Sequence, residues 1–440
     1  MIQVKHDEGP DVVIAAGLRS PWVRAGGAFR AEDAGHLGSQ VMRELLVRTG
    51  IEPGAFDEVV VGSVGPPHDQ ANIARVVALR AGIPRHVPAR TVARNCASGI
   101  EAVTSAAASI KAGVGDLYMT MGLEVMSAYP LIFGEKMTDL FARLMRARSL
   151  GQRLAAIGSF RPGFLKPRVA LLEGLTDPIS DLLMGQTAEL VARDFGITRE
   201  ECDAYAAESH RRAARARDAG RFENEILPLF PLGAKEGATS VLHDDSIRDD
   251  QSPERLAKLR PYFEKPDGVV TVGNACGITD GAGALVVTTS ERANELGLAP
   301  LARLKAWAWA GCEPARMGLG PVHATAQVLD ATGVTLGDIG AIELNEAFAA
   351  QVLGCARAFE SAEYAGEKLG RTSPLGTLDL DRTNVNGGAI ALGHPVGATG
   401  ARLLLTAAHE LEEGDHELTL ATLCIGGGQG GAVLLERIER

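Results

Sequence analysis

Three reactive side chains stand in glycine-rich surroundings of this 440-residue chain: Cys96, His394 and Cys424. Glycines allow the backbone and a ligand to approach each other closely. A histidine beside a cysteine is a common means of activating a sulfur nucleophile. Two thiols and one imidazole could therefore hold an acyl group on one sulfur while a second group moves a proton.

The residues around Cys96 predict a turn from a strand into a helix. A short apolar stretch at 91–93 runs into Cys96, and an alanine-rich helix is expected over 100–113. A thiol there would lie among unpaired N–H groups at the positive end of the helix dipole, which favours the thiolate. Taken singly, Cys96 could equally be a buried structural cysteine, and His394 a hydrogen-bonded core histidine.

A run of glycines begins at Gly426, directly after Cys424. Backbone N–H groups exposed by such a run could form an oxyanion hole. Gly426, Gly428 and Gly431 also match the G-x-G-x-x-G dinucleotide fingerprint. Too few residues follow Gly431 for the helix and second strand of that motif, so we reject this interpretation.

The elements that must position these groups alternate between strand and helix. Strands are expected at 11–16, 59–62, 341–344, 418–424 and 431–435, and helices at 34–50, 346–359 and 401–413. This order favours an α/β protein with a mainly parallel sheet covered on both faces, in two similar halves. Asn345 follows one of the strands, where it could hold a water or donate to a carbonyl, or cap the next helix.

A different region, about 127–276, separates the two halves and is richer in charge and helix signals. Thr198 and Glu201 form a capping-box pattern for a helix that ends near Gly220. Residues 131–170 hold eight Lys or Arg against two acidic residues, a local net charge of +6. The helical spacing of the apolar residues there predicts one apolar face, made of Met137, Leu140, Phe141, Leu144 and Met145.

Charge and composition exclude several classes of protein. The net charge of −11 argues against nucleic acid as a partner, because duplex binding needs clustered positive charge. No apolar run is long enough to span a membrane. The polar, acidic first ten residues carry no leader pattern, so we expect a cytoplasmic protein. The six cysteines form no C-x-x-C pair, which argues against disulfides and a zinc site.

Taken together, these residues resemble the thiolases (3-ketoacyl-CoA thiolase and acetyl-CoA acetyltransferase). The likeness covers nearly the whole chain and includes the stretches at 19–21, 96–98, 184–189, 259–261, 280–281, 345–348, 393–395 and 424–426. It implies a thiolase-like fold of two βαβαβ-type halves stacked in αβαβα layers, with an inserted helical loop domain. The implied domains are an N-terminal half (1–126 and 277–298), the inserted domain (127–276) and a C-terminal half (299–440).

The resemblance also implies a role for each reactive group. Cys96 would attack a thioester carbonyl and become acylated, while His394 takes its proton. Cys424 would be the second acid/base, acting on the α-carbon of acetyl-CoA. Asn345, through a water, and His394 would hold the thioester oxygen of the enolate. The N–H groups of Cys96 and Gly426 would hold the oxygen of the acyl-enzyme.

The reaction implied is cleavage of 3-oxoacyl-CoA by CoA to acetyl-CoA and a shortened acyl-CoA, as in fatty-acid β-oxidation. The alternative is a short-chain acetoacetyl-CoA thiolase that runs in the condensing direction. A decarboxylating condensing enzyme of the ketosynthase type would lack the second cysteine, so Cys424 argues against it.

CoA enters this reaction as a substrate, and no permanently bound cofactor or metal is expected. By resemblance the inserted domain binds CoA, with Arg248 near its nucleotide end and Cys276 near its pantetheine. Met184 and Phe348 would line the pantetheine slot. The implied partners are a second copy, as a homodimer or homotetramer, and a hydratase/dehydrogenase subunit of β-oxidation.

The basic insert at 131–170 resembles that of the β-subunits of trifunctional complexes. Those subunits usually carry His at the position of Asn345, whereas ordinary thiolases carry Asn, so the two features disagree about membership of such a complex. Two interpretations of the insert stay open. It could touch an acidic partner or an anionic surface of the inner membrane. It could instead be a solvated helix that covers the CoA entrance and attracts CoA phosphates.

Overall fold

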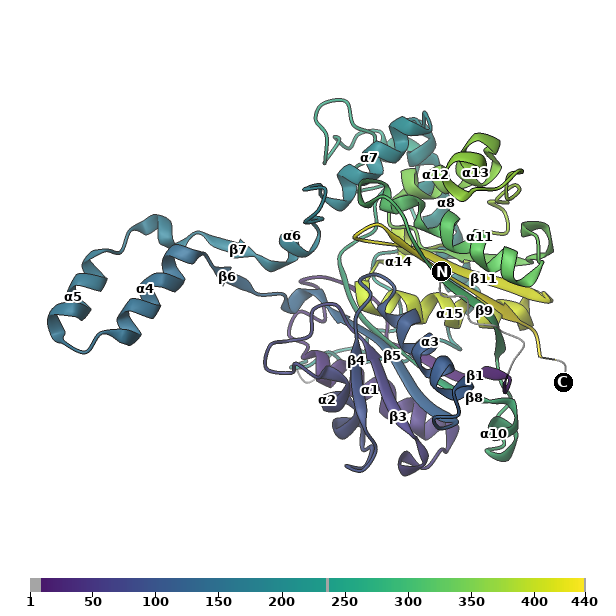
Figure 1. Cartoon of the computed structure of the whole chain (residues 1–440), viewed down its shortest axis with the longest axis horizontal. Helices are drawn as coiled ribbons and strands as arrows, with labels where there is room; N and C mark the ends of the chain where they lie inside the picture. Colours follow the sequence, from purple (N-terminus) through teal and green to yellow (C-terminus); the bar gives the residue numbers. More distant parts are fainter. Residues whose placement is uncertain (1–8, 235–236, 439–440) are drawn as a thin grey trace.

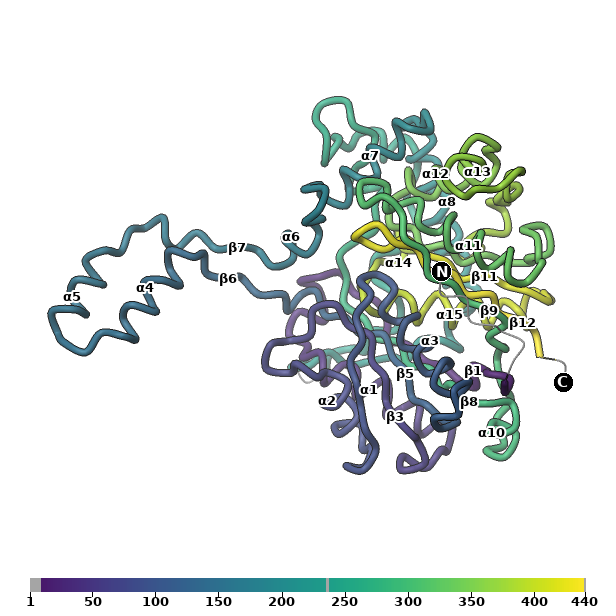
Figure 2. The backbone as a smooth tube through the Cα atoms, in the orientation of Figure 1, coloured from purple at the N-terminus to yellow at the C-terminus, as the bar shows by residue number. Residues whose placement is uncertain are grey.

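A single ten-stranded mixed sheet runs through both halves of the chain (Figures 1 and 2). The computed structural model describes residues 9–234 and 237–438, so most of the polar start lies outside the described residues. The strand order is β10-β11-β12-β9-β1-β8-β5-β3-β4, with β2 paired to β8. Strands β1 and β9 join the halves through two antiparallel residue pairs, Val13 with Arg303 and Ile14 with Ala302.

The N-terminal half begins with a strand and a capped helix. Asp33 accepts a hydrogen bond from the His36 N–H at the start of α1, and Gly50 ends that helix in the left-handed region. Its elements are β1 (Val12–Arg19), β2 (Val23–Arg24), α1 (Ala34–Thr49), β3 (Glu58–Gly62), α2 (Ile73–Ala81), β4 (Ala89–Val92), α3 (Ser98–Lys111), β5 (Leu117–Val125), β8 (Thr279–Thr289) and α10 (Ser290–Glu295).

The C-terminal half repeats this arrangement without a counterpart of β4. In the N-terminal half, β3 pairs with β5 in parallel, and the pairs β5–β8 and β8–β1 are antiparallel. In the C-terminal half, β10 pairs with β11 in parallel, and the pairs β11–β12 and β12–β9 are antiparallel. Its elements are β9 (Ala302–Gly311), α11 (Gly320–Thr332), β10 (Ala341–Leu344), α12 (Ala349–Glu360), α13 (Ala362–Leu369), α14 (Ala389–Leu392), α15 (Val396–Glu413), β11 (Leu418–Ile425) and β12 (Gln429–Glu436).

Five layers result from the way the two half-sheets bury their faces. Helices α1 and α2 cover the outer face of the N-terminal half-sheet, and α11 and α12 cover that of the other. Helices α3 and α15 pack against each other between the two half-sheets. This confirms the αβαβα fold expected from the resemblance. The expectation of a mainly parallel sheet is wrong, because β8, β9 and β12 all run antiparallel to their neighbours.

Between the halves lies a mostly helical region from which an arm projects away from the body (Figure 1). Its elements are β6 (Leu131–Phe133), α4 (Glu135–Arg146), α5 (Leu150–Gly158), β7 (Pro167–Val169), α6 (Ala170–Gly174), α7 (Met184–Asp194), α8 (Arg199–Asp218) and α9 (Pro253–Leu256). The capping box of Thr198 and Glu201 is present at the start of α8, as predicted.

The arm, residues 130–170, has a small core of its own. Met137 and Leu140 of α4 are buried there against Ala156 of α5. Phe141 and Met145, predicted to share the same apolar face, are exposed. Only part of the predicted face is therefore covered. Among the described residues, no helix is long and apolar enough to cross a membrane.

Candidate active site

Cys96 lies in a tight turn between β4 and α3. Asn95 adopts a left-handed conformation (φ 44°), which asparagine tolerates better than most residues. The Ser98 hydroxyl accepts from the Arg94 N–H (2.9 Å) and donates to the Asn95 carbonyl (2.8 Å). The Asn95 side chain in turn donates to the Gly426 carbonyl (2.8 Å), so it ties the nucleophile turn to the glycine run of the other half.

The Cys96 thiol is held in its neutral form. Burial raises its pKa, and the charge of Glu124 raises it further, whereas hydrogen bonds from the Gly426 N–H and its own N–H lower it. The expectation that the helix end would favour the thiolate is therefore wrong for the free protein. Desolvation outweighs the backbone donors, so a base must take the proton when the sulfur attacks.

His394 is suited to be that base. It is buried just before α15, and burial lowers its pKa to about 4, assisted by the charge of Arg402. Its Nδ1 lies 2.6 Å from the Thr399 hydroxyl, which donates to the Pro395 carbonyl (3.1 Å). That hydroxyl has one proton, so it accepts from Nδ1–H and leaves the lone pair on Nε2. Gly393 (φ 104°) permits the turn, since a Cβ there would clash with Thr279.

Cys424 is the penultimate residue of β11 and is almost fully buried. Burial raises its pKa well above the ordinary value, and the neighbouring thiols Cys96, Cys355 and Cys276 add to the effect. The glycine run that follows turns sharply, with Gly427 and Gly428 in the left-handed region. Cys424 is thus a neutral thiol that can donate a proton.

One cavity of about 280 Å³ brings most of the predicted groups together. It lies where the two halves meet the segment at 171–184. The predicted residues on its wall are Cys96, Met184, Cys276, Phe348, His394, Cys424 and Gly426. Much of the remaining wall is apolar, which suits an acyl chain and the pantetheine arm of CoA.

Asn345 and Arg248 do not line this cavity. Asn345 is fully buried two residues before Ala347, which does line it. Both polar atoms of its amide are without a partner among the described residues, so they are available to a water or a reactant. Arg248 is exposed, and its backbone N–H donates to His210 Nδ1 (3.2 Å). Their roles stay predictions.

Part of the cavity wall was not predicted from the sequence. Tyr129, Asp177 and the apolar residues Leu171, Leu175 and Ile179 also line the cavity. The Tyr129 hydroxyl donates to the buried carboxylate of Glu124 (3.0 Å). A buried acidic residue near the end of an apolar strand was the available signal, because Glu124 interrupts the run at 117–125.

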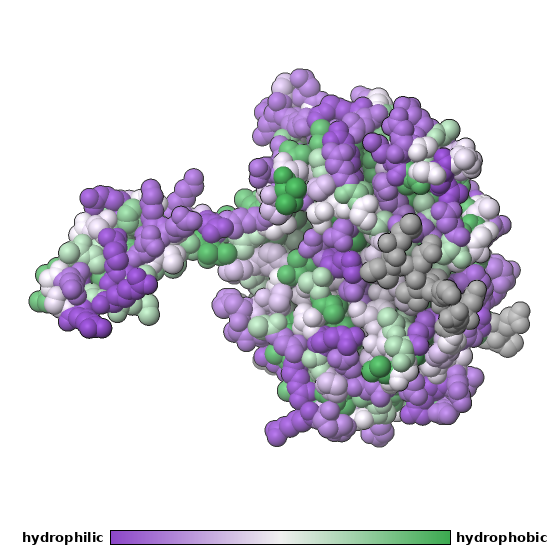
Figure 3. All heavy atoms as spheres, viewed as in Figure 1, coloured by the Kyte–Doolittle hydropathy of each residue, from purple (hydrophilic) through white to green (hydrophobic). Residues whose placement is uncertain are grey.

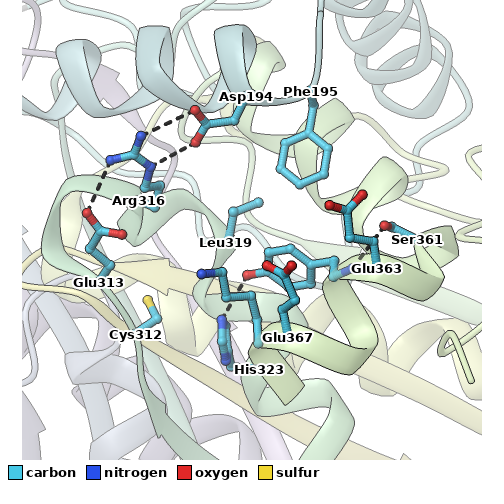
Figure 4. A pocket seen from close by; sticks show the side chains of 12 residues that line it. Asp194, Phe195, Cys312, Glu313, Arg316, Leu319, His323, Ser361, Glu363 and Glu367 are labelled. Atoms are coloured by element: carbon cyan, nitrogen blue, oxygen red, sulfur yellow. Dashed lines mark hydrogen bonds and ion pairs between the residues drawn. The ribbon is translucent and has the colours of Figure 1, made fainter. Parts of the chain in front are cut away.

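A larger depression of about 660 Å³ lies elsewhere on the C-terminal half (Figure 4). Its polar groups are largely paired with one another. Arg316 bonds to Asp194 and Glu313, and His323 to the Tyr364 hydroxyl. None of the predicted reactive groups lies on its wall, so it offers no site for the predicted chemistry.

Known proteins resemble this chain over nearly its whole length. The thiolase N-terminal domain family matches residues 12–291, and the thiolase C-terminal domain family matches 298–437. An acetyl-CoA acetyltransferase of Chromobacterium violaceum is 41% identical over 432 residues, covering 97% of this chain and 100% of that protein. A 3-ketoacyl-CoA thiolase of Serratia proteamaculans is 37% identical over 429 residues, covering 97% of each.

Solved structures give the same result. The human mitochondrial 3-ketoacyl-CoA thiolase in complex with CoA has a TM-score of 0.83 at 33% identity, with 98% of each chain covered. The acetyl-CoA acetyltransferase of Bacillus anthracis has a TM-score of 0.85 at 36% identity, with 98% of this chain and 100% of that chain covered.

Proposed function

The chain belongs to the thiolase family, and from this premise we propose that Cys96, His394, Cys424 and Asn345 carry out its reaction. The protein is an acyltransferase that cleaves 3-oxoacyl-CoA with CoA, giving acetyl-CoA and a shortened acyl-CoA. The observation that supports these residue roles is the single cavity that holds Cys96, His394 and Cys424.

The first half of the reaction breaks a carbon–carbon bond. Nε2 of His394 takes the Cys96 proton as the sulfur attacks the 3-oxo carbon. The bond between C2 and C3 then breaks, and its electron pair passes to C2 of the departing acetyl-CoA enolate. Cys424 donates its proton to C2, which its raised pKa allows because it holds that proton at neutral pH. The acyl group stays on Cys96.

The second half transfers the acyl group to CoA. The CoA thiol attacks the acyl carbon and its proton passes to the Cys424 thiolate that the first half leaves. The bond to the Cys96 sulfur breaks, and the protonated His394 returns its proton to that sulfur. Backbone N–H groups of Cys96 and Gly426 hold the negative oxygen that forms on the acyl carbon. Asn345, through a water, and His394 hold the enolate oxygen of acetyl-CoA. In the free protein the Cys96 thiol and the His394 imidazole are both uncharged. This suits the proposed reaction, because charges on the two groups form only when the sulfur attacks.

The experiment that tests these roles is thiolysis by purified protein with free CoA. Cys96→Ala is expected to abolish turnover, because it removes the sulfur that carries the acyl group in the proposed reaction. Cys312→Ala is the matched control, because this thiol lies on the wall of the separate depression. Turnover that survives in Cys96→Ala would refute the role of Cys96.

For the substrate range we propose 3-oxoacyl-CoA of medium or long chain rather than acetoacetyl-CoA alone. The support is the apolar wall at Leu171, Leu175 and Ile179, which extends the cavity beyond the reactive groups. Thiolysis rates with acetoacetyl-CoA and a long-chain 3-oxoacyl-CoA decide between them. Activity confined to acetoacetyl-CoA would favour the short-chain, condensing alternative.

We propose that residues 127–276 form the CoA-binding domain between N-terminal (1–126, 277–298) and C-terminal (299–440) halves. Arg248 would contact the nucleotide end of CoA, and Met184, Cys276 and Phe348 its pantetheine. Substitution Arg248→Ala should then raise the KM for CoA and leave kcat little changed. A KM equal to the wild type would remove Arg248 from the site. CoA is a substrate here, and no permanently bound cofactor is part of the proposal.

The arm is proposed to contact the anionic surface of a membrane. It carries nine of the twenty exposed large apolar side chains of the described residues, beside its net charge of +6 (Figure 3). Leu150, Leu154 and Ile157 form one exposed stripe on α5. Basic and apolar groups together suit a headgroup interface. No arm residue lines the cavity, so a cover over the CoA entrance is the weaker interpretation.

Sedimentation with phosphatidylglycerol and phosphatidylcholine vesicles at low salt tests this contact. Binding to the anionic vesicles alone is expected, and replacing Leu150, Leu154 and Ile157 by Ser should weaken it without changing thiolysis. No binding to anionic vesicles would refute the proposal. We further propose that the protein is cytoplasmic with peripheral membrane contact, and that it forms a homodimer or homotetramer. We also propose that it binds a hydratase/dehydrogenase subunit. Sedimentation velocity tests the oligomeric state, and co-purification tests the subunit.

A further inference from the structure

Glu124 is a buried carboxylate behind the wall of the active-site cavity, and it accepts four hydrogen bonds. It lies on β5 and is 1% exposed. Oε1 accepts from the Gly65 N–H (3.1 Å) and the Tyr129 hydroxyl (3.0 Å). Oε2 accepts from the Val64 N–H (2.9 Å) and the Gly397 N–H (3.0 Å). Both oxygens are therefore fully used as acceptors.

These donors favour the ionised form of Glu124. Three of the four are backbone N–H groups, which cannot accept a proton in return. Burial raises the pKa of Glu124, and the hydrogen bonds from Val64, Gly65, Tyr129 and Gly397 oppose that effect. Among the described residues no Lys, Arg or His forms an ion pair with it. The ionised carboxylate would thus place a negative charge behind the cavity wall, held by hydrogen bonds alone.

The contacts of Glu124 reach three parts of the catalytic apparatus. Gly397 is in the first turn of α15, three residues after His394. A Cβ at Gly397 would lie 2.6 Å from Oε2, so only glycine allows this approach. Val64 and Tyr129 are on the cavity wall with Cys96. Glu124 therefore connects the helix that carries the base to the wall around the nucleophile.

The internal repeat of the fold adds a second argument. Strands β5 and β11 are equivalent in the two half-sheets, and Glu124 and Cys424 are the penultimate residues of their strands. Each faces a glycine of the adjacent strand, Gly281 or Gly430. Glu124 thus occupies the position in one half that Cys424 occupies in the other, although only Cys424 lines the cavity.

We propose that Glu124 is a positioning residue for the reaction: it fixes the first turn of α15 against the cavity wall, and its charge adds to the effect of burial in disfavouring the Cys96 thiolate. This inference rests on the proposed role of Cys96 as the nucleophile. The other titratable groups around Cys96 are Cys276, Cys424, His394, Tyr129 and Asp177. Of the charged residues, Glu124 is the one that acts on the Cys96 thiol.

Alkylation of Cys96 by iodoacetamide tests the charge without requiring turnover. Intact-mass spectrometry follows the rate from pH 6 to 10 in wild type, Glu124→Gln and Glu124→Asp. At pH 7.5, Glu124→Gln is expected to be alkylated about tenfold faster, because removing a nearby negative charge favours the thiolate. Thiolysis by the same variant should be at least tenfold slower, because α15 loses its anchor. The two rates change in opposite directions.

Two further variants separate charge from looser packing. Glu124→Asp keeps the charge, so its alkylation profile should stay close to that of the wild type. Tyr129→Phe removes one donor and keeps the carboxylate, so its alkylation rate should stay within about twofold of the wild type. Equal alkylation of Glu124→Gln and wild type would overturn the proposal. If Glu124→Gln does not fold, a wild-type Cys96 pKa at or below the ordinary 8.5 would overturn it alone.

Discussion

The lowered pKa of His394 makes a quantitative prediction about the acid limit of acylation. Burial, with a contribution from the charge of Arg402, lowers this pKa from 6.5 to about 4. The neutral imidazole accepts the Cys96 proton, so the acylation rate should follow the neutral fraction. A lowered pKa extends that fraction to more acidic solution. At pH 5.5 an ordinary histidine would be about 90% protonated, whereas His394 would be about 3% protonated.

The assay is the formation of acetyl-enzyme from acetyl-CoA in quench flow, read by intact mass. Between pH 7.5 and 5.5 the rate should stay within about twofold, whereas an ordinary histidine would give a tenfold fall. Cys96→Ala is the control, because it should give no acetyl-enzyme at any pH. A rate that begins to fall near pH 6.5 would show that His394 has an ordinary pKa, and the argument from burial would be refuted.

Three more predictions follow from the packing. Thr399→Val removes the acceptor for Nδ1–H of His394 and should slow acetyl-enzyme formation about tenfold, the equivalent of about 1.4 kcal/mol; an unchanged rate would exclude this role. Gly99→Ala should lower the free energy of unfolding by about 1–3 kcal/mol, because its Cβ would lie 2.6 Å from a backbone nitrogen of α15. Gly151→Ala, a helical glycine with open space, is its control and should be neutral or stabilising in the same urea titrations. The pKa values of His210 and His394 are both lowered to about 4 in the folded protein, so the unfolded chain binds more protons than the folded one below pH 6.5. The free energy of unfolding should therefore fall as the pH is lowered from 6.5 to 4. A free energy of unfolding that does not change over this range would contradict the prediction.

The sequence was most accurate for strands and helices in which apolar residues recur at a regular spacing. The strand at 341–344 agrees with β10 at both ends, and the helix at 34–50 differs from α1 by one residue. Strand β8 (Thr279–Thr289) was missed, because its first half is rich in glycine and alanine and lacks the usual strand residues. Strand β9 was also not predicted, and without these two antiparallel strands the alternation of strand and helix suggested a mainly parallel sheet.

Reactive groups with distinctive neighbours were easier to predict than their supports. Seven of the predicted site residues share one cavity, and glycines or a turn mark several of them in the sequence. Glu124 could not be assigned, because its donors come from residues 64, 65, 129 and 397, which only the fold brings together. Arm residues Phe141 and Met145 follow the same periodicity as Met137 and Leu140, so periodicity alone could not tell which were covered.

The pairing of β1 with β9 has a mechanical consequence. It joins the two half-sheets, and the packing of α3 on α15 fixes Cys96 and His394 at the ends of adjoining helices. A hinge between the halves would have to break both contacts, so the distance between nucleophile and base should vary little during turnover. We therefore expect passage of CoA and acyl chains to depend on the wall segment at 171–179, which includes the exposed Leu172 and Ile179. On this view the segment at 171–179 would move when substrate enters and product leaves, while the two halves that hold Cys96 and His394 stay fixed relative to each other.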